Sequence, residues 1–220
     1  MSQEQGQHRI SAIVSVSGAI LVLVGTYLHP LPDDPNDAQA AFAAYAADRL
    51  WVASHLIQWL GVVLIIVVFM LLSRRMAHGA AADWAYAGMA GAIGSLSMAS
   101  ALQAIDGIAL KASVDAWAAA SDNQKAILFQ TALGTRQIEI GLASIVTLLT
   151  GMTVSIYGIA FLIDQGCPNW LGLLGIIDGV MLISAGLATA YAGFSDIAMT
   201  LSMPSSVLLL VWVIIVGVFM

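Results

Sequence analysis

The stretch 134–141, Gly-Thr-Arg-Gln-Ile-Glu-Ile-Gly, places two charged side chains, Arg136 and Glu139, at the head of a long apolar run. The run continues to Ile163 without a further charge. It is long enough to cross a lipid bilayer, which takes about 20 apolar residues. A charge inside such a segment is costly, so it indicates a functional site or a buried ion pair. The stretch therefore predicts a membrane protein with a polar site inside the membrane.

The composition favours the same class of protein. Of the 220 residues, 60% are hydrophobic and 9% are charged, whereas a soluble domain carries about 25% charged residues. The formal net charge of −6 argues against nucleic acid as a partner. The single cysteine, Cys167, excludes an internal disulfide. The lipid bilayer is the partner that the composition implies, and a homo-oligomer or a partner membrane subunit stays open.

Six apolar stretches are long enough to span the membrane, and they predict an all-α helical bundle in one transmembrane domain. The first stretch is too long for a signal peptide and lacks a small-residue cleavage site, so we expect it to be retained. The predicted spans are residues 10–28, 50–72, 84–110, 132–163, 170–191 and 199–220.

Two connections are predicted to be amphipathic segments outside the cytoplasm. Residues 29–49 hold an alanine-rich helix with Phe42 and Tyr45 on one face. Residues 111–133 hold a second helix, which we expect Gly134 to separate from the span that follows.

The basic residues next to the spans set the expected orientation. Arg9 and the adjacent pair Arg74 and Arg75 flank the same side of the bundle, and loops on the cytoplasmic side carry an excess of basic residues. The opposite side carries three basic residues of its own, so the prediction depends on the first span and the arginine pair. Both termini are accordingly predicted to be cytoplasmic.

Three predicted spans each carry two polar residues spaced i, i+3, which places both on one helix face. At 1.5 Å per residue, each pair lies roughly 6–10 Å inside the same side of the membrane. We therefore expect the three pairs to face one another in the outer third of the membrane and to form a ligand-binding site. The pairs are His55 with Gln58, Gln103 with Asp106, and Arg136 with Glu139.

Three functions fit this cluster. The leading hypothesis is binding of a small polar or ionic ligand, with translocation as an extension, and Arg136 would anchor an anionic ligand. The second is a metal- or haem-dependent membrane enzyme in which His55, Asp106 and Glu139 bind the metal. His29, at the end of the first span, would then make a two-histidine site for haem or copper. The third is a structural or accessory subunit. The sequence does not decide whether the protein is an enzyme or which cofactor it takes.

One ionisable residue lies deeper in the membrane. Asp178 is about 12 Å inside the fifth span by helical rise. As a coupling residue, Asp178 would extend a proton or ion path from the cluster. Ser155 on the fourth span lies at a similar depth and could be its hydrogen-bond partner. A protonated aspartate that hydrogen-bonds for packing fits the sequence equally well.

Residues 10–75 show a characteristic order of features. A first span is followed by an acidic Pro/Asp turn at 32–37 and an alanine-rich helix at 37–48. The segment 49–51, Arg-Leu-Trp, then opens a span that closes with Leu-Leu-Ser-Arg-Arg at 71–75. This order resembles a broad group of small bacterial polytopic membrane proteins classed as a domain of unknown function. The resemblance covers about the first third of the chain and implies a bundle in the bacterial inner membrane, with no assigned activity.

Overall fold

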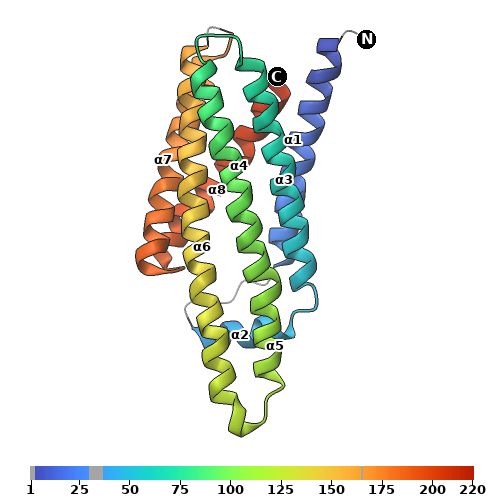
Figure 1. The fold of residues 1–220 in the computed structure, drawn as a ribbon, viewed down its shortest axis with the longest axis vertical. Coiled ribbons are helices and arrows are strands. Elements are labelled where there is room, and N and C mark those ends of the chain that lie inside the picture. The colour runs from blue at the N-terminus through green and yellow to red at the C-terminus, as the bar shows by residue number, and fades with distance from the viewer. Residues whose placement is uncertain (1–2, 30–36, 165) are drawn as a thin grey trace.

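A computed structural model describes residues 3–29, 37–164 and 166–220, with side chains from His8 onward. These residues form an elongated all-α bundle (Figure 1). The helices in chain order are α1 (Gln3–Leu28), α2 (Ala38–Ala47), α3 (Trp51–Met76), α4 (Ala82–Ala104), the π-helical segment η1 (Ile105–Leu110), α5 (Lys111–Ala118), α6 (Asp122–Ile163), α7 (Asn169–Ala192) and α8 (Asp196–Phe219).

The described residues contain six helical segments that are long and apolar enough to cross a membrane. This confirms the prediction of a multi-pass helical membrane protein. Large apolar side chains such as Ile13, Leu173 and Val207 are exposed on the outside of the bundle, as expected where lipid is the solvent. The segments are His8–Leu28, Trp51–Met76, Ala82–Ala118, Asp122–Ile163, Asn169–Ala192 and Asp196–Phe219.

The six spanning helices form a closed ring. Around the ring, α1 packs on α3, α3 on α4, α4 on α6, α6 on α7, α7 on α8, and α8 on α1. Both termini lie at one end of the bundle, which we call the termini end (Figure 1). The short helix α2 lies across the bundle towards the opposite end, which we call the α2 end.

Aromatic side chains fill the ring in its termini half. Phe69, Tyr157 and Trp212 are buried there on α3, α6 and α8. Tyr157 Oη lies 2.7 Å from Ser73 Oγ and 3.1 Å from the carbonyl oxygen of Phe69. Because Ser73 also donates to the carbonyl of Ala85 at 3.0 Å, one small network joins α3, α4 and α6.

The contact between α6 and α7 depends on glycine. A Cβ atom on Gly158 would lie 2.7 Å from the carbonyl oxygen of Gly172, and a Cβ on Gly172 would lie 2.7 Å from that of Gly158. Small residues at such crossings let two membrane helices approach at backbone distance.

Gly134 does not interrupt the fourth span, so that prediction was wrong. α6 runs unbroken from Asp122 to Ile163, and a Cβ at Gly134 would meet nothing within 4 Å. A glycine costs a helix only about 1 kcal/mol relative to alanine, and an established helix propagates across it. The segment 111–133 was predicted to hold a separate helix, and this prediction was also wrong. The segment is a hairpin in which α5 extends the third span and the first residues of α6 begin the fourth (Figure 1).

The first connection does contain the predicted short helix. Asp37 caps α2, because its Oδ1 accepts two backbone N–H groups of the first turn at 3.1 Å. Phe42 and Tyr45 on one face of α2 are buried in a small core with Trp51 and Trp117. The predicted Pro/Asp turn spans 32–37, and its residues 32–36 lie outside the described residues.

Candidate functional site

The polar pair on α3 contacts the polar pair on the α4–η1 helix, residue against residue. His55 Nε2 lies 3.0 Å from Asp106 Oδ2. Gln103 Nε2 donates to Gln58 Oε1 at 3.3 Å, and Gln58 Nε2 donates to Thr26 of α1 at 3.3 Å. The structure thus brings four of the six predicted site residues together on two neighbouring helices.

His55 is held in a defined orientation and tautomer. Its side chain is 2% exposed, and its Nδ1 lies 2.7 Å from the carbonyl oxygen of Trp51. A carbonyl oxygen only accepts hydrogen bonds, so Nδ1 carries the hydrogen and Nε2 of the neutral ring is an acceptor. Among the described residues, no group has hydrogen-bond geometry to Nε2. An electron-rich nitrogen therefore faces the carboxylate of Asp106, an arrangement that calls for a cation or a proton between them.

A π-helical turn places Asp106 against His55. Asp106 lies in η1, whose carbonyl at Asp106 accepts the indole N–H of Trp51 at 3.0 Å. The next residue, Gly107, is buried, and a Cβ there would lie 2.6 Å from Cβ of His55. The absence of a side chain at Gly107 lets η1 approach the imidazole. Single π turns inside α-helices occur frequently at functional sites.

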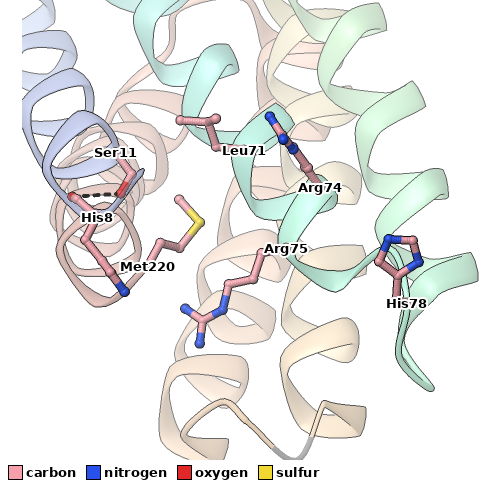
Figure 2. Close-up of a pocket in the computed structure, with 7 residues that line it drawn as sticks. All are labelled: His8, Ser11, Leu71, Arg74, Arg75, His78 and Met220. Atoms are coloured by element: carbon pink, nitrogen blue, oxygen red, sulfur yellow. Dashed lines mark hydrogen bonds between the residues drawn. The ribbon is translucent and has the colours of Figure 1, made fainter. Parts of the chain in front are cut away.

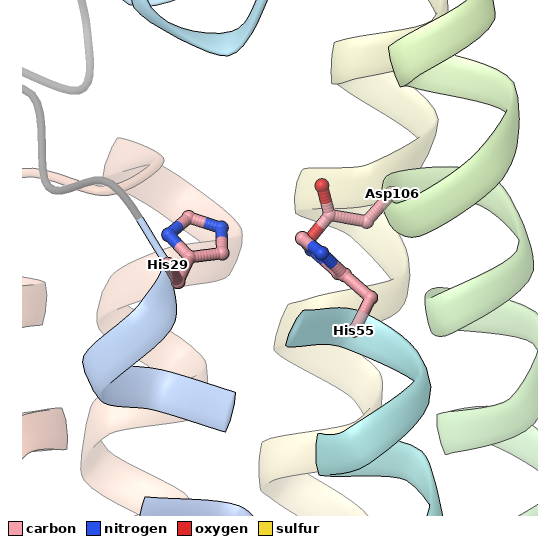
Figure 3. Close-up of side chains that lie close together, drawn as sticks. All are labelled: His29, His55 and Asp106. Carbon is pink, nitrogen blue, oxygen red and sulfur yellow. The ribbon is translucent and has the colours of Figure 1, made fainter. Parts of the chain in front are cut away.

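His29 completes a group of three potential metal ligands. It follows the last residue of α1, and its ring centroid is 4.9 Å from that of His55. One ligand atom each from His29, His55 and Asp106 lies within 4.8 Å of the other two. We call these three residues the His–His–Asp cluster; their side chains converge from three helical segments (Figure 3). The sequence predicted His55, Asp106 and Glu139 as the metal ligands. Within the described residues, the third member of the group is His29 and not Glu139.

Glu139 is instead paired with Arg136 on the same helix. One guanidinium nitrogen of Arg136 donates to both carboxylate oxygens of Glu139 at 2.7 Å, and both residues are buried. The guanidinium carbon lies 5.5 Å from the ring centroid of Tyr45 and 4.8 Å from that of Phe194. A buried arginine is stabilised by such aromatic faces. The structure thus places the predicted anion anchor, Arg136, in an internal ion pair.

The ion pair lies close enough to the His–His–Asp cluster to share its electrostatics. The charge of Glu139 interacts with Asp106 and with His55. The buried Arg136 and Glu139 and the half-buried Asp106 therefore form one electrostatic group. This group carries a net charge of −1 when both carboxylates are ionised and both imidazoles are neutral. One more cation near Asp106 would be stabilised by this excess negative charge.

Aromatic rings from α2 and from the first turn of α3 cover the cluster. The ring of Tyr45 lies 4.2 Å, centroid to centroid, from that of Trp51, which lies 4.7 Å from that of His55. Burial raises the pKa of Tyr45 to about 12. The site predicted from the sequence included neither Trp51 nor Tyr45. The i, i+4 spacing of Trp51 and His55 was the one signal that could have linked this ring to the site.

Asp178 is separate from the cluster. It is fully buried on α7 in the termini half, and neither carboxylate oxygen has a hydrogen-bond partner among the described residues. Ser155 Oγ packs against Gly179 and has no hydrogen-bond partner within the described ranges. In the part of the chain that the structure describes, Asp178 and Ser155 therefore form no hydrogen bond with each other.

The comparisons with known proteins add no relative. No protein-family model, no curated protein and no solved structure matches this chain. The resemblance of residues 10–75 to a group of bacterial membrane proteins stays a prediction.

Proposed function

We propose that this polytopic membrane protein binds a divalent transition-metal ion in the His–His–Asp cluster. The observation that carries the proposal is the orientation of His55. Its Nδ1–H donates to the carbonyl of Trp51, and its Nε2 faces Asp106. Metal-binding histidines are held in this way, with the second ring nitrogen donating to a carbonyl or a carboxylate.

The donor set suits a transition metal. Two imidazole nitrogens and one carboxylate oxygen are ligands for Zn²⁺ and for Fe, Cu or Mn ions. The 3.0 Å separation of His55 Nε2 and Asp106 Oδ2 is that of adjacent ligands at about 90° with bonds of about 2.1 Å. Two ligands of one ion are at most about 4.2 Å apart with such bonds. Tetrahedral ligands with such bonds are about 3.4 Å apart. His29 therefore needs to approach by up to about 1.4 Å from the observed limit of 4.8 Å.

The charge of the site favours an exchangeable further ligand. A divalent ion would change the net charge of the cluster and its neighbouring ion pair from −1 to +1. An anion or a hydroxide in an open coordination position would balance the remaining charge. Three protein ligands with an open position are typical of catalytic zinc sites, whereas structural sites use four protein ligands.

Metal analysis of the purified protein tests the proposal. After chelator treatment and titration with Zn²⁺, we expect about one tightly bound ion per chain. His55→Gln should weaken binding by at least about 100-fold, more than the loss of an outer hydrogen bond causes. His78→Gln is the matched control, because His78 is exposed at the termini end. Equal zinc affinity in wild type, His55→Gln and His78→Gln would contradict the proposal and favour a His55–Asp106 ion pair held by a proton.

Translocation of the bound ion is a second candidate function, and Asp178 is the observation that favours it. A fully buried carboxylate without a hydrogen bond among the described residues is typical of ion and proton paths in membranes. Proteoliposomes that enclose a zinc-sensitive dye would measure flux. We expect Asp178→Asn to abolish flux and to leave zinc binding at the cluster unchanged. Wild-type flux equal to that of protein-free liposomes would rule out translocation without affecting the binding proposal.

A further inference from the structure

A second polar site lies at the termini end, remote from the His–His–Asp cluster. A cavity of about 550 Å³ opens there between the ends of α1, α3 and α8. Four basic side chains line it, and its described lining contains no acidic side chain. Figure 2 shows these residues around the cavity; they are His8, Arg74, Arg75 and His78.

The basic groups keep unused hydrogen-bond donors. The side chains of Arg74 and His78 are exposed and make no hydrogen bond or ion pair with any residue that the structure describes. Arg75 donates one long hydrogen bond, 3.4 Å, to the carbonyl of Phe219 and lies over its ring at 5.1 Å. That contact holds the Arg75 guanidinium beside the cavity with other N–H groups available. The cavity is thus suited to a phosphate or another anion.

An apolar groove adjoins the basic cavity. The groove is lined mainly by residues of α8 and has a volume of about 770 Å³. His8 lines both hollows, so they meet at this residue. The apolar lining residues are Ile214, Ile215, Val218 and Phe219.

We propose that the cavity and the groove together bind one anionic phospholipid. The headgroup phosphate would contact Arg74 and Arg75, and an acyl chain would lie along the groove. The site lies at the ends of spanning helices, and this position supports a phospholipid as the ligand, because spanning helices end where lipid headgroups lie. Basic pockets between membrane helices are known headgroup sites. The groove distinguishes a lipid from free phosphate, because a small anion leaves it unused.

The test compares three ligands on the purified protein in neutral detergent. Phosphatidylglycerol, phosphatidylcholine with the same acyl chains, and inorganic phosphate are each titrated while thermal unfolding is followed. We expect only phosphatidylglycerol to raise the unfolding temperature. Arg74→Gln should weaken its apparent affinity about fivefold, the effect of one basic residue near a membrane surface. Arg49→Gln is the matched control, because Arg49 is an exposed arginine that precedes α3 at the α2 end.

A groove substitution separates the two parts of the site. Val218→Trp places a larger side chain in the groove and leaves the charge of the cavity unchanged. It should weaken phosphatidylglycerol binding about as much as Arg74→Gln does. If inorganic phosphate stabilises the protein as much as phosphatidylglycerol does, the ligand is a free anion and the lipid proposal is wrong. If phosphatidylcholine stabilises it equally, the contact with lipid is unspecific and the proposal is also wrong. Native mass spectrometry of the wild type supplies a readout without variants, and retention of phosphatidylcholine equal to that of phosphatidylglycerol would overturn the proposal.

Discussion

Trp51 fixes both members of the pair formed by His55 and Asp106. The carbonyl oxygen of Trp51 lies 2.7 Å from Nδ1 of His55, and its indole N–H donates to the carbonyl of Asp106 at 3.0 Å. The 3.0 Å approach of His55 Nε2 to Asp106 Oδ2 is therefore set by one residue that contacts both sides. A ligand set held in this way loses little conformational freedom when it binds an ion.

Trp51→Phe tests this positioning role. Phenylalanine keeps the backbone carbonyl that orients His55 but removes the indole N–H that holds Asp106. We expect zinc affinity to fall by about 10–100-fold, the usual effect of losing an outer hydrogen bond. The control is Trp59→Phe, because the indole N–H of Trp59 donates to Ser100 at 2.9 Å and, among the described residues, forms no hydrogen bond with the cluster. Zinc titration of the two variants measures the difference, and an equal affinity would show that Trp51 only fills space.

Gly107→Ala tests the close approach of η1 to α3. The new methyl group would lie 2.6 Å from Cβ and 2.9 Å from Cγ of His55, so His55 or the π turn must move. Overpacking of this kind costs about 1–3 kcal/mol. We expect a lower unfolding temperature together with weaker zinc binding.

Gly141→Ala is the matched control for that substitution. Gly141 lies within α6, and a Cβ there would meet nothing within 4 Å. Alanine is favoured over glycine inside a helix by about 1 kcal/mol. This variant should be as stable as the wild type or slightly more stable. If Gly107→Ala behaves like Gly141→Ala, the backbone of η1 does not approach His55 as closely as described.

The sequence predicted the six spans, but it did not predict which of the polar residues pair. Apolar spans are hydrophobic on all sides, so their periodicity does not show which face meets a neighbour. The register of His55 with Asp106 depends on the π turn, for which the sequence carries no signal. His29 was predicted only as an additional ligand in the metal alternative. The sequence does not show its contact with His55, because that contact arises from the packing of α1 on α3. The helix boundary predicted at Gly134 was wrong, because local helix propensity is a weak guide inside a long helix.

Tyr45 should titrate far above an ordinary tyrosine, because α2 buries it outside the spanning segments. Its pKa is raised to about 12 by burial, and the unfolded value is about 10. Between pH 10 and pH 12 the unfolded chain loses this proton while the folded chain keeps it. The contribution of Tyr45 to stability is therefore fully present below about pH 10 and is lost as pH rises towards 12.

Ultraviolet titration of phenolate formation measures this shift. The difference between the wild type and Tyr45→Phe isolates the signal of one ring, which we expect to have its midpoint near pH 12. A midpoint near pH 10 would mean that water reaches the ring and that α2 does not cover the cluster.

The buried pair of Arg136 and Glu139 is expected to show strong coupling. Both side chains are buried, and one guanidinium nitrogen donates to both carboxylate oxygens. Glu139→Gln leaves the arginine charge without its counter-ion, and breaking a buried pair in this way costs about 3–5 kcal/mol. Arg136→Met with Glu139→Gln removes both charges, so the double variant should be more stable than Glu139→Gln. The pair of half-buried Lys111 and exposed Asp115, 2.6 Å apart, is the control, and Asp115→Asn should cost less, about 1 kcal/mol.

Zinc affinity of the same variants separates the ion pair from the metal ligands. If Glu139 acts only through its charge, Glu139→Gln weakens zinc binding modestly, because the cluster loses one nearby negative charge but no ligand atom. The double variant, which removes one charge of each sign, should then regain affinity close to that of the wild type. A loss in the double variant as large as that in His55→Gln would mean that Glu139 itself binds the ion. The metal set would in that case be His55, Asp106 and Glu139, and Arg136 would be its counter-charge.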